Sequence, residues 1–137
     1  MTIQAPVCIT ISEMGEVGNA RRAAAQLLDK SEFDEVDAGN VAIVVNELAT
    51  NLAKHAGGGL ISLRIIRAGD DSELEIVCVD GGPGIHDIER CLEDGYSTKG
   101  TSGSGLGAIK RISREFDFYS QAGKGTVQVV RLGKRST

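Results

Sequence analysis

The sequence is poor in the residue types that build metal centres and disulfide frameworks. It has three cysteines, two histidines and no tryptophan among 137 residues. Cys8, Cys78 and Cys91 lie far apart and include no Cys-x-x-Cys pair, so they favour neither a zinc site nor a set of disulfides. We expect them to be free thiols that pack as small apolar side chains.

Two further absences restrict the class of protein. No apolar run approaches the length that spans a bilayer, and no basic segment followed by an apolar one opens the chain, which predicts a cytoplasmic protein with no membrane partner. The net charge is -4 and no long basic run occurs, which argues against nucleic acid as a partner. With 41% hydrophobic and 25% charged residues, we expect residues 1–137 to form one globular domain.

Glycine, by contrast, is abundant. The chain has 18 glycines, roughly twice the average share of about 7%. Most of the excess falls in residues 57–59, 81–84 and 95–107, and the last two clusters each lead into amphipathic helical sequence. Glycines in such places let the backbone approach a ligand closely. A low-complexity linker is the competing interpretation.

Hydrophobic periodicity predicts the order of the elements. We expect strands over Val7 to Ile11, Leu60 to Arg67, Glu73 to Asp80, Phe118 to Gln121 and Thr126 to Leu132. We expect helices from Ser12 or Glu13 to about Lys30, from Asp34 or Asp37 to about Ala56, over Ile85 to Glu93, and from Gly105 to Phe116. This order predicts an α+β fold, a two-layer sandwich in which a mixed, mostly antiparallel sheet carries helices on one face.

The second predicted helix carries a polar row at the edge of its apolar stripe. The stripe is formed by Val41, Val44, Val45, Leu48 and Leu52. Glu47, Asn51 and His55 recur every four residues, so they form one line along the helix surface. Such a line at the border of a core either faces a ligand pocket or is a solvated flank. The pattern by itself leaves both interpretations open.

The predicted strand that ends at Asp80 runs directly into glycines that bracket a proline. Asp80 either makes the hydrogen bond of a tight turn or accepts a hydrogen bond from a ligand amine. In the second case Gly82 and Gly84 leave room for a flat ring. The segment alone does not decide between the two.

Residues 95–107 form a third segment of this kind. We expect a mobile loop up to Ser104, followed by a helix that begins at about Leu106. Backbone amides at the N-terminus of a helix bind phosphate, and Ser97, Thr98, Lys99 and Ser104 could add donors. The segment lacks the Gly-Lys-Ser/Thr ending of a P-loop and follows no parallel-strand unit. A flexible linker is again the alternative.

In order and spacing, these segments resemble the nucleotide-binding boxes of the GHKL ATPase superfamily over about residues 7–132. The resemblance implies the Bergerat ATP-binding fold, with ATP and Mg²⁺ as cofactors. Asn51 is similar to the asparagine that ligates Mg²⁺, and Glu47 to the acid proposed as catalytic base. Lys54 and His55 match the Lys-His that often ends this box.

The resemblance extends to the adenine and phosphate ends of the site. Asp80 resembles the aspartate that receives the adenine amino group, with Gly82 and Gly84 beside the base. Thr126 is similar to the threonine that supports this aspartate. The lid and helix start that cover the phosphates are matched by Gly103, Gly105, Leu106 and Gly107.

Within the superfamily, the chain resembles the small bacterial serine kinases and anti-sigma factors. This implies an ATP-dependent protein serine/threonine kinase that phosphorylates a STAS-domain regulatory partner in stress or sigma-factor signalling. The alternative is an ATP-dependent binding module, without phosphotransfer, that acts on a sigma factor or activates a phosphatase or cyclase. Residues 100–105 lack the arginine that anti-sigma relatives commonly carry there, which disfavours sigma-factor sequestration.

Overall fold

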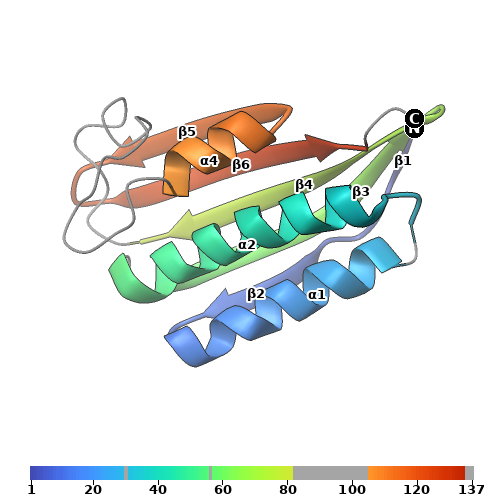
Figure 1. Cartoon of the computed structure of the whole chain (residues 1–137). Coiled ribbons are helices and arrows are strands. Elements are labelled where there is room, and N and C mark those ends of the chain that lie inside the picture. The colour runs from blue at the N-terminus through green and yellow to red at the C-terminus, as the bar shows by residue number, and fades with distance from the viewer. Residues whose placement is uncertain (30, 56, 82–104, 135–137) are drawn as a thin grey trace.

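The computed structural model describes residues 1–29, 31–55, 57–81 and 105–134. Over these ranges a β-sheet carries helices on one face (Figure 1). The helical elements are a 3-10 turn at Met14–Glu16, α1 at Val17–Asp29, α2 at Glu35–His55 and α4 at Gly105–Ile112. The strands are β1 at Thr2–Ile3, β2 at Val7–Ile11, β3 at Gly59–Ala68, β4 at Asp71–Asp80, β5 at Glu115–Gln121 and β6 at Gly125–Gly133.

The described strands form one six-stranded sheet in the order β1-β3-β4-β6-β5, with β2 also paired to β3. Each of these pairings is antiparallel, where the sequence led us to expect a mixed, mostly antiparallel sheet. The predicted α+β fold is confirmed, and the helices lie on a single face of the sheet (Figure 1). No helix within the described ranges is long and apolar enough to cross a membrane.

The first predicted helix is divided in two. Its start is the 3-10 turn, where the Glu16 side chain accepts hydrogen bonds from the backbone N–H groups of Ser12 (2.9 Å) and Glu13 (3.2 Å). This capping box satisfies donors that have no partner inside the helix. The α-helix proper begins at Val17.

Helix α2 begins and ends where the sequence predicts, to within a residue. The backbone N–H of Asp37 donates to the Asp34 carboxylate (2.8 Å), and the N–H of Asp34 donates back to Asp37 (3.1 Å). At the other end Gly57 has φ +73°, and the N–H of Gly58 donates to the carbonyl of Leu52 (2.8 Å). Glycine in the left-handed region ends a helix in this way and turns the chain into β3.

The predicted helix from Gly105 to Phe116 is wrong at its C-terminal end. Helix α4 stops at Ile112, and β5 begins at Glu115 rather than Phe118. The N–H and hydroxyl of Ser113 both donate to the carbonyl of Ile109, which closes the helix. Pairing of β5 with β6 then places Phe116 opposite Val130 and gives this segment the period of a strand.

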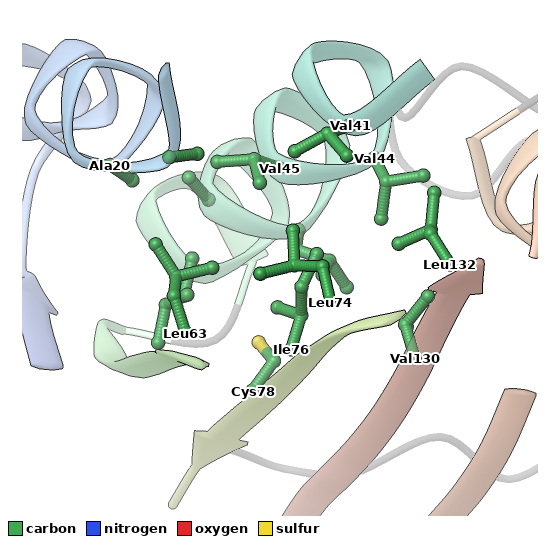
Figure 2. Close-up of a cluster of buried hydrophobic side chains, with 14 of the residues drawn as sticks. Ala20, Val41, Val44, Val45, Leu63, Leu74, Ile76, Cys78, Val130 and Leu132 are labelled. Carbon is green, nitrogen blue, oxygen red and sulfur yellow. The ribbon is translucent and has the colours of Figure 1, made fainter. Parts of the chain in front are cut away.

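The core lies between the helices and the inner face of the sheet. Figure 2 shows Val41, Val44 and Val45 of α2 directed toward Leu74, Ile76 and Cys78 of β4 and toward Val130 and Leu132 of β6. All of these side chains are buried. The predicted apolar stripe of α2, which also includes Leu48 and Leu52, is therefore confirmed. Each such side chain contributes roughly 1.5–3 kcal/mol relative to an exposed one.

The outer face of the sheet carries a row of alternating charge. Arg64, Glu75, Arg131 and Glu115 occupy directly opposed positions on four adjacent strands. Glu75 is buried and accepts hydrogen bonds from Arg64 (2.7 Å) and Arg131 (3.1 Å). Burial raises the pKa of Glu75, but the two arginines outweigh it and hold the pKa below the ordinary value of 4.5.

Candidate functional site

Four chain segments meet at one end of the molecule, on the left of Figure 1. They are the C-terminal end of α2, the end of β4, the start of β6 and the start of α4. Each of these segments contains at least one residue of the predicted nucleotide site. Residues that lie up to about eighty positions apart in the sequence are thus brought to the same edge of the two layers.

Asp80 is the last residue of β4 and is half-buried. It lies two residues beyond Cys78 on the same strand, so the two side chains share the face of the sheet that carries the helices. Burial, and then the negative charge of Asp80, raise the pKa of the Cys78 thiol to about 12. The carboxylate of Asp80 therefore lies at the margin of the apolar core, where a hydrogen bond to it is strong.

Thr126 lies directly opposite Asp80, as the register of β4 and β6 shows. It is buried, and its hydroxyl lies 2.9 Å from the hydroxyl of Ser120 on β5. Three adjacent strands thus contribute Asp80, Thr126 and Ser120 to one row of polar groups at the end of the inner face. Among the residues expected at the adenine end of the site, Asp80 and Thr126 are paired directly.

Two glycines hold the backbone close on either side of Asp80. A Cβ atom at Gly125 would collide with the carbonyl oxygen of Asp80, and Gly125 has φ +113°, which other residues rarely adopt. A Cβ atom at Gly59 would lie 2.7 Å from Cδ2 of Leu52 and 3.2 Å from Cβ of Asp80. Gly59 therefore places the end of β4 beside the turn of α2 that contains Asn51.

The polar row of α2 occupies the border of the core. Glu47 and Asn51 are half-buried, between the fully buried Leu48 and Leu52 and the exposed side of the helix. Lys54 is exposed, and His55 is the last residue of the helix. Their intermediate burial confirms that this row lies at the border of the core.

Helix α4 begins at Gly105, which is the start of the predicted range Gly105 to Phe116. Leu106 is half-buried and packs against the core, and Gly107 is buried. The first turn carries no acidic side chain, and Lys110 and Arg111 lie in the last turn. The partial positive charge at the N-terminus of the helix is thus available to an anion such as phosphate.

The other predicted ligand-binding residues lie outside the described residues. They are Gly82, Gly84, Ser97, Thr98, Lys99, Gly103 and Ser104. The predicted helix from Ile85 to Glu93 and the predicted mobile loop also fall there, as does Cys91. Of the other two cysteines, Cys78 is a free thiol packed in the core as expected, whereas the free thiol Cys8 is exposed and does not pack as an apolar side chain.

Sequence reasoning missed three residues around Asp80. Gly59 and Gly125 give no signal beyond glycine itself, because their role depends on contacts between strands. Gln128 is different, since it shares the inner face of β6 with Val130 and Leu132, and alternation alone marks a polar residue on that face. Within the described ranges no group of three or more His, Cys, Asp or Glu side chains is arranged to hold a metal ion.

Comparison with known proteins identifies a matching domain family and two similar relatives. The histidine kinase-like ATPase domain family matches residues 11–132. The chain is 34% identical over 125 residues to the serine/threonine-protein kinase RsbT of Bacillus subtilis, covering 90% of this chain and 94% of RsbT. It is 30% identical over 99 residues to an anti-sigma F factor of Caldanaerobacter subterraneus, covering 69% of this chain and 68% of that factor.

A solved structure supports the fold. The crystal structure of the RsbU and RsbW domains of a Mycobacterium tuberculosis protein is similar with a TM-score of 0.63 at 15% identity. The similarity covers 97% of this chain and 34% of that one, so this chain spans about a third of the larger protein. The family match and the similarity to RsbT each extend over most of the sequence. The chain therefore belongs to the histidine kinase-like ATPase domain family, whose fold binds ATP.

Proposed function

We propose that the protein is an ATP-dependent serine/threonine kinase that phosphorylates a STAS-domain regulatory protein and acts as a switch in bacterial stress or sigma-factor signalling. The observation that carries the proposal is the similarity to the kinase RsbT, which extends over nearly the whole of both chains. The arrangement of the described residues supports it, because the segments that contain Asn51, Asp80, Gly105 and Thr126 meet at one end of the molecule (Figure 1).

Asp80 and Thr126 are the residues that we assign to adenine. A carboxylate accepts a hydrogen bond from the amine at C6 of adenine, where guanine carries a carbonyl oxygen. Because Asp80 is half-buried beside the core, this hydrogen bond forms in a region of low dielectric and discriminates strongly between bases. Thr126, directly opposite, supports the carboxylate from the neighbouring strand.

We assign the phosphate end of the site to residues of α2 and α4. Mg²⁺ on a nucleotide commonly takes only one or two protein oxygens, with phosphate and water completing its shell. The half-buried amide of Asn51 fits that requirement. Asn51 would hold the ion there, and the ion would supply charge neutralisation at the phosphates. Lys54, Lys99 and the N-terminal turn of α4 add positive potential. Hydrogen-bond donors to the phosphates come from His55, Ser97, Thr98, Ser104 and the backbone amide of Gly103.

Glu47 is the group that we assign to proton transfer. It lies four residues before Asn51 on the same edge of α2, about 6 Å along the helix axis. From there its carboxylate can accept the proton of a serine or threonine hydroxyl as the hydroxyl oxygen attacks the γ-phosphorus of ATP. The bond from the γ-phosphorus to the β,γ-bridging oxygen breaks, and ADP leaves. Such a base contributes to chemistry more than to nucleotide binding.

Transfer of label tests the proposal. The protein is incubated with ATP labelled in the γ-phosphate and with candidate STAS-domain proteins, and the label is located by mass spectrometry. We expect phosphate on a serine or threonine of one STAS domain, and no transfer to the variant of that domain with alanine at the acceptor position. Absence of transfer to a STAS protein that binds tightly would contradict kinase activity.

A second candidate function is supported by the similarity to an anti-sigma F factor. In this function ATP binding creates a surface that sequesters or activates a partner, such as a sigma factor, a phosphatase or a cyclase, without phosphotransfer. ATP-dependent capture of the partner in a pull-down, with no label transferred, would favour this function. Both functions need the same nucleotide site.

A further inference from the structure

Gln128 carries a buried polar atom that the described part of the fold leaves without a hydrogen bond. The residue is 5% exposed, and its side-chain oxygen Oε1 has no hydrogen-bond partner among the described residues. It follows Thr126 by two positions on β6, on the inner face that continues with the buried Val130 and Leu132. An apolar residue would continue this surface at no such cost.

Buried side-chain oxygens without a partner are uncommon, because each forfeits the hydrogen bonds that it makes with water. The neighbours of Gln128 within the sheet do not relieve the cost. Cys78, directly opposite, remains a protonated thiol and only a weak donor, since burial raises its pKa. The hydroxyl of Thr126 is engaged with Ser120. Among the described residues no donor satisfies Oε1, so this acceptor is open to a bound molecule.

The position of Gln128 indicates which molecule. Asp80 is paired with Thr126 and Cys78 with Gln128, so Asp80 and Gln128 are diagonal neighbours on the same face of β4 and β6. Diagonal neighbours on two paired strands lie about 7–8 Å apart, which is within reach of long side chains. A small group between them can therefore meet two acceptors, the carboxylate of Asp80 and Oε1 of Gln128.

We infer that Gln128 is a specificity-determining residue of the nucleotide site, whose Oε1 accepts the second N–H of the adenine exocyclic amine. This inference rests on the proposed assignment of Asp80 to the same amine. The amine has two N–H donors, and the carboxylate takes one. Guanine presents a carbonyl oxygen at that position, which would face two acceptors.

The test compares two nucleotides and two variants. N6-methyl-ATP keeps one amine hydrogen and replaces the other with a methyl group, and Gln128→Met keeps the length of the side chain without its acceptor. We expect the wild type to bind N6-methyl-ATP less tightly than ATP, and Gln128→Met to bind ATP about 3- to 10-fold more weakly than the wild type, the value of one hydrogen bond. The variant should show a smaller difference between the two nucleotides.

Stability separates this role from a structural one. Without nucleotide, Gln128→Met should raise the Tm by roughly 2–5 °C, because the unsatisfied oxygen is removed. Gln26→Met, at an exposed position of α1, is the matched control and should change neither the affinity for ATP nor the Tm. Lower affinity together with higher stability is a combination that a merely structural role does not produce.

Two outcomes would overturn the inference. One is an unchanged affinity of folded Gln128→Met for ATP, and the other is an equal loss for ATP and N6-methyl-ATP. Asp80→Asn, titrated in parallel, distinguishes this failure from failure of the proposed function. If Asp80→Asn binds ATP as the wild type does, the adenine site itself is misplaced; if only Gln128→Met is unaffected, the second contact alone is refuted.

Discussion

Replacement of Asp80 by asparagine tests the adenine assignment most cleanly. The substitution keeps the shape of the side chain and removes its charge at the end of β4. It leaves the pairing of Asp80 with Thr126 intact, since that pairing is made by the backbone. Burial, the larger cause of the raised pKa of Cys78, also persists, so the thiol stays protonated in the core. The variant should therefore fold.

The expected magnitude follows from the kind of hydrogen bond that is lost. A hydrogen bond to a charged group contributes about 1.5–3 kcal/mol, against about 0.5–1.5 kcal/mol for a neutral pair. The half-buried position of Asp80 supports the range for a charged group rather than the range for a neutral pair. We expect Asp80→Asn to weaken ATP binding by about 1.5–3 kcal/mol, or roughly 10- to 150-fold in Kd.

Isothermal titration calorimetry with ATP in Mg²⁺ measures this loss, with circular dichroism to verify the fold. Asp117→Asn is a matched control, because Asp117 is exposed on β5 and lies on the outer face of the sheet. The control should bind ATP as the wild type does. An unchanged Kd in folded Asp80→Asn would refute the assignment of this carboxylate to adenine.

Three further substitutions test other parts of the account. Asn51→Ala should weaken ATP binding in Mg²⁺ but leave residual binding in EDTA unchanged, because the amide acts through the ion; an equal loss in both would make Asn51 structural. Gly125→Ala should destabilise the protein by about 1–3 kcal/mol in urea unfolding, since it forces a methyl group against Asp80 at positive φ, whereas Gly39→Ala, with open space around it, should not. Glu75 has a folded pKa below 4.5, so its contribution to stability is present above that pH and is lost as the pH falls through the folded value. The unfolding free energies of wild type and Glu75→Gln should therefore converge in acid, and a constant difference would contradict the ion-pair row.

The sequence was sufficient for most of the fold because its periodicities are strong. The stripe of α2 and the alternation of β3, β4 and β6 each match a buried face of the structure. The boundary between α4 and β5 could not be predicted from the sequence. Leu106, Ile109, Ile112 and Phe116 keep a helical spacing, but Phe116 also fits the alternation of β5. Pairing with β6, a contact between distant residues, decides between the two periods.

The candidate site was predictable in its parts rather than in its arrangement. Asp80 and Thr126 could be singled out from their motifs, but their direct opposition depends on the register of β4 and β6. The same register places Gln128 diagonal to Asp80, which no local pattern reveals. The roles of Glu47 and Asn51, and the organisation of residues 1–137 as one domain, stay predictions.

The central claim is that this chain transfers phosphate and does not only bind a partner, and Glu47 offers the most direct measurement. Single-turnover transfer from ATP to a STAS-domain protein is measured for wild type, Glu47→Ala and the control Glu35→Ala, an exposed acid in the first turn of the same helix. A pull-down with the same partner is run beside it. We expect Glu47→Ala to bind ATP and the partner as the wild type does but to transfer phosphate at least about a hundredfold more slowly, while Glu35→Ala transfers normally. Near-normal transfer by Glu47→Ala would contradict the role of Glu47 as the catalytic base. No transfer by the wild type to a partner that it binds would contradict kinase activity.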